Sequence, residues 1–207
     1  INLMTKYYNN DDNNLITFSD LEKNNKGIIC LSGGVNGPIG KSILYKNSLV
    51  ADKIFKNLNS IYEGNFFIEL SRSGLDDEKK TENFFLSLAN KFNIPIVATN
   101  NNYFSDINMH EATDALLCIK NIEKLSNPER KFLSKEFFFK SSSDMNKIFQ
   151  DIPESITNTL LIAKKCSYML ESSKPMLPKF LNSTIDENNE LYKLSHQGLN
   201  DKILKIN

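Results

Sequence analysis

A glycine-rich segment at residues 33–42, GGVNGPIGKS, is the first candidate for chemistry because it could bind a phosphate. It follows an apolar run and ends in the letters GKS, as does a P-loop, whose backbone amides surround the phosphates while the lysine reaches them. The first glycine of that motif would have to stand at position 35, which is Val35, and Pro38 removes an amide donor from the loop. We therefore interpret the segment as a glycine-rich turn and keep a P-loop with Lys41 as an alternative.

Glu69 and His110 are the other side chains suited to catalysis or metal binding. Glu69 closes an apolar run close to Arg72, so it is either a catalytic carboxylate or, as we expect, a paired structural acid. His110 precedes an acid, but no second histidine follows four residues later, and His196 lies far along the chain. We interpret His110 as a helix-start or surface residue.

The composition is that of a globular domain with few special features. Hydrophobic residues make up 40% and charged residues 24%, and the 25 basic and 25 acidic residues balance. A domain that held DNA by itself would carry a basic excess, so we do not expect this chain to do so. No apolar run has the length of a membrane span and no signal segment is visible, so we expect a cytoplasmic protein without a membrane partner. Three widely spaced cysteines are predicted to be buried thiols: Cys30, Cys118 and Cys166.

Three apolar, β-branched-rich runs at residues 28–32, 66–70 and 95–99 are typical of strands, and helical patterns separate them. This alternation predicts an α/β fold with parallel strands and outer helices, in which ligand sites gather at the carboxyl ends of the strands. The predicted helices carry sets of apolar residues that share a face: Leu49, Ile54, Leu58 and Ile61; Phe85, Leu88, Ala89 and Phe92; Ala112, Leu116 and Ile119; Ile156, Leu160 and Ala163.

Local signals set several helix boundaries. Ser19 and Glu22 have capping-box spacing, Asn93 suits a left-handed cap, and Pro153 suits the first residue of a helix. From Ser172 the chain reads as a linker, with a domain boundary near 172–182 and a further helix over 190–204. Because the chain starts without methionine and stops inside a helical pattern, we expect a fragment of a longer protein.

Taken in order, six phrases resemble the family of bacterial DNA polymerase III alpha subunits, and together they cover nearly the whole chain. They are LSGGVNGPIG (31–40), FFIELSRSGLDDE (66–78), IPIVATNNNYF (94–104), HEATDALLCI (110–119), FFFKSSSDMNKIFQDIPESITNTLLIAKKCSY (137–168) and KPMLPKF (174–180). The resemblance implies that residues 1–172 are the C-terminal portion of a PHP domain, a distorted (βα)7 barrel, and that residues 173–207 lead as a short helical appendage towards the palm.

The resemblance also points to a lost metal site. Active PHP domains bind metals through histidines and acids at the strand ends, and three of those positions here hold Ser73, Asn101 and Tyr103. A hydroxyl, an amide and a phenol do not replace imidazoles and a carboxylate around a divalent cation. Glu69 remains as a polar group nearby, and a further histidine motif of the family lies upstream of Ile1.

From this resemblance we expect an inactive PHP scaffold within a replicative polymerase, binding no metal or other cofactor itself. The catalytic magnesium would belong to the palm, outside this chain. The implied partners are the rest of the alpha subunit, the proofreading exonuclease subunit, and DNA through other domains. The alternatives are an active metal-dependent PHP phosphoesterase and the P-loop protein described above.

Overall fold

The computed structural model describes residues 2–9, 15–130, 133–169, 171–172, 174–175 and 186–205. In chain order the elements are α1 (Asn2–Asn9), α2 (Phe18–Lys23), β1 (Cys30–Leu31), η1 (Gly34–Asn36), α3 (Pro38–Leu44), α4 (Ser48–Ile61), β2 (Phe66–Ser71), α5 (Asp76–Phe92), β3 (Ile96–Thr99), η2 (Ile107–Met109), α6 (His110–Asn121), α7 (Ser142–Ile148), α8 (Pro153–Lys165) and α9 (Glu187–Leu204). None of the helices in these ranges combines the length and hydrophobicity that a membrane crossing needs.

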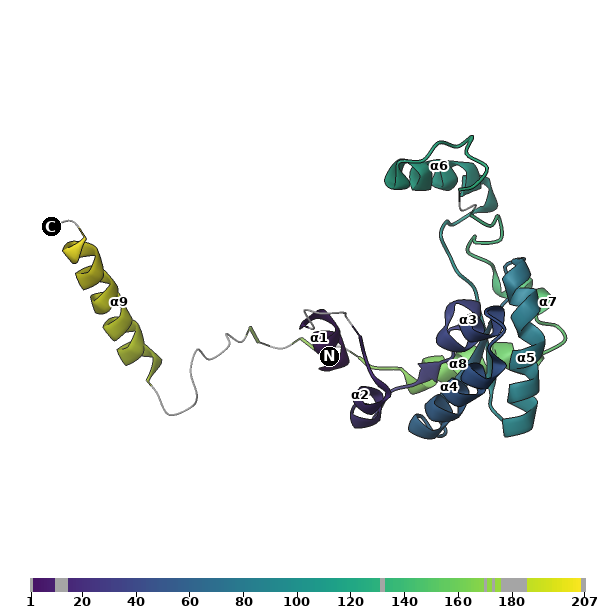
Figure 1. Cartoon of the computed structure of the whole chain (residues 1–207), viewed down its shortest axis with the longest axis horizontal. Coiled ribbons are helices and arrows are strands. Elements are labelled where there is room, and N and C mark those ends of the chain that lie inside the picture. Colours follow the sequence, from purple (N-terminus) through teal and green to yellow (C-terminus); the bar gives the residue numbers. More distant parts are fainter. Residues whose placement is uncertain are drawn as a thin grey trace. The chain divides into compact units, whose positions relative to one another are not determined.

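The chain divides into two compact units, Ile1–Ser167 and Tyr168–Asn207. The larger unit carries the sheet and its helices, and the smaller one carries α9 (Figure 1). The predicted boundary near 172–182 lies mostly outside the described residues, whereas the helix predicted over 190–204 is present as α9.

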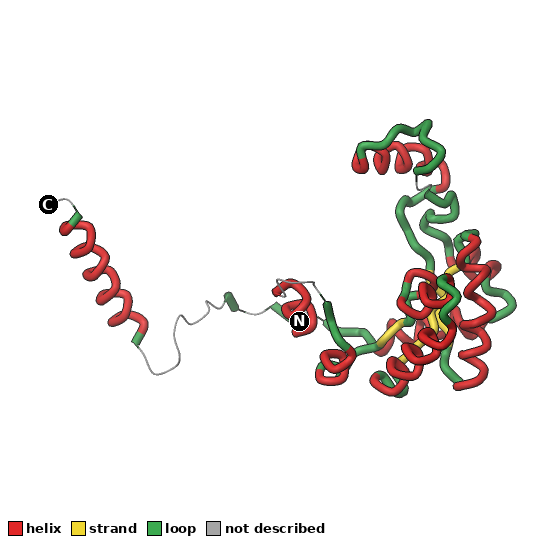
Figure 2. The backbone as a smooth tube through the Cα atoms, viewed as in Figure 1, coloured by secondary structure: helices red, strands yellow, loops and turns green. Residues whose placement is uncertain are grey.

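Three parallel strands in the order β1-β2-β3 form the sheet. Cys30 pairs with Phe66 at one end of β2, and Ser71 pairs with Thr99 at the other. The predicted α/β architecture with parallel strands is confirmed, although β1 is shorter than the run at 28–32. Figure 2 shows the strands, in yellow, among the helices of the larger unit.

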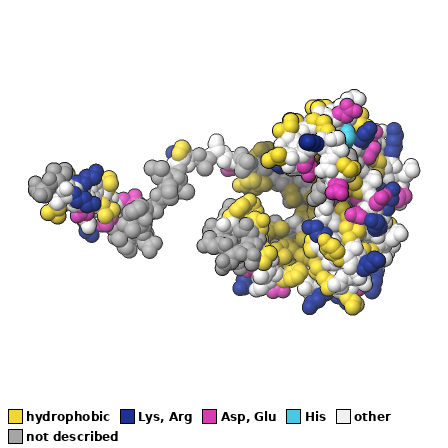
Figure 3. Space-filling model, turned by 45° about the horizontal axis from the view of Figure 1, so that its top comes forward, with side chains coloured by type: hydrophobic (Ala, Val, Ile, Leu, Met, Phe, Trp, Pro, Cys, Tyr) yellow, Lys and Arg dark blue, Asp and Glu magenta, His cyan; other side chains and the backbone are white. Residues whose placement is uncertain are grey.

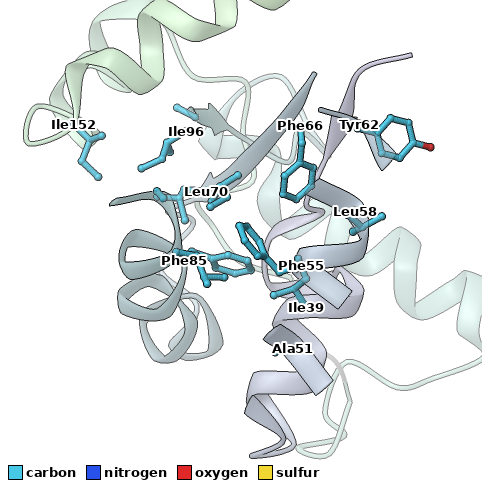
Figure 4. Close-up of a cluster of buried hydrophobic side chains, with 14 of the residues drawn as sticks. Ile39, Ala51, Phe55, Leu58, Tyr62, Phe66, Leu70, Phe85, Ile96 and Ile152 are labelled. Carbon is cyan, nitrogen blue, oxygen red and sulfur yellow. The ribbon is translucent and has the colours of Figure 1, made fainter. Parts of the chain in front are cut away.

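The hydrophobic core lies between the sheet and the helices that flank β2 in the sequence (Figure 4). Successive side chains of a strand point to opposite faces, so alternate residues of β2 enter one cluster: Phe66, Ile68 and Leu70. Phe55 of α4 packs between aromatic rings, with ring centroids 5.7 Å from Phe66 and 5.0 Å from Phe92. The sheet is therefore fixed to α4 and α5 by large apolar side chains.

The face of α4 that meets the core differs from the predicted one. Leu58 and Ile61 are buried as expected for a shared apolar face, but Leu49 is 82% exposed. Ala51 and Phe55 take its place in the core. Residues two positions apart in a helix point in directions about 200° apart around its axis, so Leu49 lies on the side opposite to Ala51.

Helix caps agree with the sequence at two positions and differ at a third. Asn93 ends α5 with a left-handed φ of 53°, and Pro153 begins α8. The first capping box is formed by Thr17 and Asp20 instead of Ser19 and Glu22, because Thr17 N donates to Asp20 Oδ2 at 3.0 Å and Asp20 N donates to Thr17 Oγ1. The helix consequently begins at Phe18.

The cysteines are all free thiols, as predicted, but they are not all buried. Cys118 is buried and Cys30 is half-buried, and burial raises the pKa of Cys30 to about 11. Cys166 is exposed because it follows the last residue of α8, where the chain leaves the larger unit.

We expect Phe55→Ala to lower the free energy of unfolding by about 3–5 kcal/mol, since it removes a fully buried ring and leaves a cavity. Leu49→Ala, on the same helix, is the matched control and should change stability by less than about 0.5 kcal/mol. Urea denaturation followed by circular dichroism measures both. Equal losses for the two variants would contradict this packing of α4.

Candidate functional site at the carboxyl end of the sheet

The candidate site lies beyond the Ser71–Thr99 pair, where β2 and β3 end at the same edge of the sheet. The structure places Ser73 and Asn101 each two residues past this pair. The sequence-predicted positions therefore follow neighbouring strand ends, as the sequence implied. Their surroundings, however, differ sharply from one another.

Ser73 is enclosed by protein and has no exposed surface. Its backbone N donates to Glu78 Oε2 at 2.7 Å, and its carbonyl oxygen accepts a hydrogen bond from Ser134 Oγ at 2.8 Å. Its own Oγ is buried without a hydrogen-bond partner among the described residues. The backbone of Ser73 thus stabilises the loop through two hydrogen bonds, whereas its hydroxyl forms none with the described residues.

Asn101 and Tyr103 lie on the surface. The Tyr103 side chain is 58% exposed, and its ring stacks on Phe137 with the centroids 5.2 Å apart. Its backbone N donates to Phe137 O at 2.9 Å. No hydrogen bond between described residues links the side chains of Ser73, Asn101 and Tyr103.

Glu69 is half-buried two residues before the end of β2, and its side chain is hydrogen-bonded to the neighbouring strand. Its Oε1 accepts a hydrogen bond from Thr99 Oγ1 at 2.8 Å, and its backbone N donates to Ser32 Oγ at 2.9 Å. It lines a cavity of about 10 Å³, a space for roughly one water molecule, together with Glu78 and Glu82. Glu69 is therefore a hydrogen-bonded acid between neighbouring strands.

Glu78 organises the loop after β2, a role that the sequence analysis missed. This carboxylate is 5% exposed and accepts three hydrogen bonds: from Ser71 Oγ at 3.0 Å, Ser73 N at 2.7 Å and Leu75 N at 3.3 Å. It stands in the first turn of α5, where the helix dipole favours a negative charge. An acid near the start of a predicted helix, after a serine-rich turn, is the signal that could have revealed it.

Arg72 fastens the same loop to the helices around it. Its guanidinium donates to both carboxylate oxygens of Asp151, at 2.6 and 2.8 Å, to Glu82 from Nε at 3.1 Å, and to Ile148 O at 2.7 Å. The group also lies 4.9 Å from the centre of the Phe149 ring. The hydrogen bond from Arg72 holds the pKa of Asp151 below its ordinary value. Arg72 thus pairs with Glu82 and Asp151, while the acid nearer in the strand, Glu69, bonds to a threonine.

Lys140 places a buried cation beside the loop that follows β3. Its Nζ lies 3.3 Å from Glu136 Oε2 and 3.4 Å from Asn100 Oδ1, and it stands 4.3 Å from the centre of the Phe138 ring. Asn100 Nδ2 donates in turn to Phe138 O at 2.8 Å. The loop after β3 is therefore held by amide, carbonyl and ammonium groups, and the nearby carboxylate of Glu136 is paired with Lys140.

An arm formed by η2, α6 and the following loop projects from this edge of the sheet (Figure 1). His110 is half-buried at its base, where Nε2–H donates to Leu133 O at 2.8 Å and Nδ1 is buried without a partner among the described residues. His110 begins α6, which agrees with its interpretation as a helix-start residue, and its side chain is half-buried. Inside the arm Arg130 donates from both terminal nitrogens to Asp114, each at 2.7 Å, and lowers the pKa of that carboxyl.

The glycines at residues 33–40 pack backbone against backbone. Gly33 has a φ of 80°, which an L side chain rarely adopts. A Cβ on Gly37 would lie 2.2 Å from Ser32 O, and one on Gly40 would lie 2.4 Å from Gly34 O. These glycines are thus accounted for by the tight passage from β1 through η1 into α3, with Pro38 as the first residue of the helix.

The donor set at the strand ends does not fit a bound metal ion. In the described part of the chain, no group of three or more histidine, cysteine, aspartate or glutamate side chains could hold a metal ion. The acids that are present bind amides, hydroxyls or a guanidinium. The geometry instead supports a structural network that fixes two loops.

Comparison with known proteins gives consistent matches to one protein over a limited part of its length. The chain is 37% identical over 186 residues to the DNA polymerase III subunit alpha of Rickettsia bellii, which covers 90% of the chain and 16% of the relative. It is 33% identical over 184 residues to the same subunit of Caulobacter vibrioides, a match that covers 89% of the chain and 16% of the relative. The same subunit of Haemophilus influenzae is 32% identical over 205 residues, a match that covers 98% of the chain and 18% of the relative.

The chain thus spans about a sixth of the length of these relatives. No protein-family model matches the chain.

We expect Glu78→Ala to lower the free energy of unfolding by about 1–3 kcal/mol, because it leaves buried N–H groups of the loop unsatisfied. Asp76→Ala, in the same helical turn but with an exposed side chain, is the matched control and should change stability by less than about 0.5 kcal/mol. Chemical denaturation tests this. The role assigned to Glu78 is wrong if the two variants are equally stable.

The arm should loosen in acid. Because Arg130 lowers the pKa of Asp114, the stabilisation is complete above the ordinary aspartate value of about 3.9 and is lost as the pH falls through the lower value in the folded protein. Hydrogen-exchange protection of α6 amides, corrected for intrinsic rates, should exceed that of Asp114→Asn at neutral pH and approach it as the pH falls below the ordinary aspartate value of about 3.9. A constant difference between wild type and variant across this range would refute the assignment.

Proposed function

The chain is homologous to one segment of the DNA polymerase III alpha subunits, and on this basis we propose that it is part of a replicative polymerase that copies DNA by template-directed nucleotidyl transfer. The observation that carries this proposal is sequence identity of 32–37% over 89–98% of the chain. The reaction itself would use palm carboxylates and magnesium outside residues 1–207. The natural setting would be the cytoplasm.

Residues 1–172 would form the C-terminal portion of a PHP domain, and residues 173–207 would lead to the next region. Parallel strands joined by outer helices suit part of a (βα)7 barrel. β1 supports this view, because in the described ranges it pairs on one side alone and presents Leu31 at 38% exposure. A further strand of the same polypeptide would complete the pairing.

We assign this piece the role of an inactive scaffold that supports the polymerase. Ser73, which stands where active relatives would need a metal ligand, is closed off by Glu78 and Ser134. Asn101 brings no negative charge, and Tyr103 turns its ring onto Phe137. The balanced net charge supports DNA contact through other domains, and the exonuclease subunit is the expected protein partner.

The polymerase assignment is tested with the full-length natural protein that contains these residues. We expect it to extend a primed DNA template in the presence of magnesium, and a triple variant at Ser73, Asn101 and Tyr103, each changed to alanine, should retain its rate within about twofold. Failure of the wild type to extend primers would overturn the polymerase assignment. Loss of extension in a triple variant that remains folded would overturn the scaffold role.

We further expect the 207-residue chain to retain no zinc or manganese after dialysis and to leave p-nitrophenyl phosphate intact. Elemental analysis measures the first and absorbance the second. The comparison protein is a variant with Ser73→His, Asn101→Asp and Tyr103→His, which restores ligand types suited to divalent cations. Stoichiometric metal in the wild type that disappears on Ser73→Ala would favour the phosphoesterase instead.

A further inference from the structure

α6 buries Asp114 and Cys118 but leaves two large aliphatic side chains exposed, whereas an ordinary surface helix turns such side chains towards the core. Leu116 and Ile119, which the sequence places on one face, are 65% and 74% exposed. On the inner side Asp114 is 7% exposed and forms the ion pair with Arg130. Hydrophobic side chains also reach the surface of the larger unit in other places (Figure 3), but here they follow a helical stripe.

Ile122, just past α6, continues this stripe, and its backbone is in a strained conformation. It caps the helix with a φ of 58°, a left-handed conformation that favours glycine or asparagine and is unusual for a β-branched residue. Its side chain is nevertheless 96% exposed, so it gains no packing among the described residues that would offset the strain. A strained backbone that displays an isoleucine to solvent points to a contact made by that side chain.

The stripe is held in a fixed position. The bidentate pair of Arg130 and Asp114 closes the arm, Arg130 Nε donates to Leu125 O at 3.2 Å, and His110 ties the start of α6 to Leu133. Beyond the arm, Ser134 Oγ donates to Ser73 O in the loop that follows β2. An outward apolar face on a braced helix needs little further ordering when another helix packs on it.

The size of the face indicates what kind of partner covers it. A helix of 12 residues is roughly 18 Å long and about 10 Å wide, so one face covers far less than the about 800 Å² per partner of a stable free complex. A tethered partner does not need that area, because a covalent link supplies a high effective concentration. The relatives extend well beyond the matched segment, which makes up 16–18% of their length.

We propose that the outer face of α6, formed by Ala112, Leu116, Ile119 and Ile122, is the docking site for an amphipathic helix from the same polypeptide outside residues 1–207. This inference rests on the proposed function, since it requires the longer protein. The aliphatic stripe at helical spacing fits a facing aliphatic helix. Glu111 and Lys120, exposed near opposite ends of α6, would select a partner helix with a base near the first and an acid near the second.

The test compares one substitution in two proteins. Ile119→Lys should leave the urea midpoint of the 207-residue chain unchanged, because the side chain is exposed there. In the full-length protein the same change should lower the midpoint of the transition that includes residues 1–207. Lys147→Glu on α7, another exposed site, is the control and should be silent in both. Silence of Ile119→Lys in both proteins would overturn the proposal.

A second measurement locates the contact. With Cys166→Ser removing the exposed native thiol, Ile119→Cys should react with a maleimide at least tenfold more slowly in the full-length protein than in the 207-residue chain. Equal rates in both would also overturn the docking site. Primer extension by the same full-length sample distinguishes the two proposals. If the sample extends primers and the cysteine at position 119 reacts at the full rate, docking alone is refuted. If that cysteine is protected from the maleimide but the sample extends no primers, the polymerase assignment alone is refuted.

Discussion

β2 is hydrogen-bonded to a parallel strand on each side, and this pairing places the core and the strand-end loops of the larger unit. One face of β2 enters the main hydrophobic cluster through Phe66, Ile68 and Leu70, which fixes α4 and α5 against the sheet. In the second half of β2, Glu69 accepts a hydrogen bond from Thr99 on β3. Because parallel strands end together, both strand-end loops must then be built at the same edge.

The polar groups around the loop after β2 hold that loop in place. Glu78 accepts from the loop after β2, and Arg72 joins that loop to Glu82 and Asp151. A carboxylate that already accepts several N–H bonds, or that faces a guanidinium, is a poor ligand for a cation because the cation must displace those partners. The polar groups at this edge of the sheet are thus engaged in contacts that fix the loops.

The sequence predicted the parallel strands because each apolar run is short, β-branched and separated from the next by a helix. It did not predict which helical residues are buried: Leu49 and Leu116 belong to apolar stripes, yet both point to solvent. A periodic pattern identifies a face but not the element it meets. The role of Glu78 was equally hidden, because two of its three partners are backbone amides, which carry no sequence signal. The positions Ser73 and Asn101 came from the family resemblance and lie at the strand ends as expected.

Anomalous diffraction from crystals of the full-length natural protein, grown with manganese and zinc, tests the central claim most directly. Loops whose polar groups are engaged within the fold predict no anomalous peak within coordination distance of Ser73, Asn101 or Tyr103. A well-occupied peak at the ends of β2 and β3 would contradict the account, because it would show that these loops still coordinate a metal.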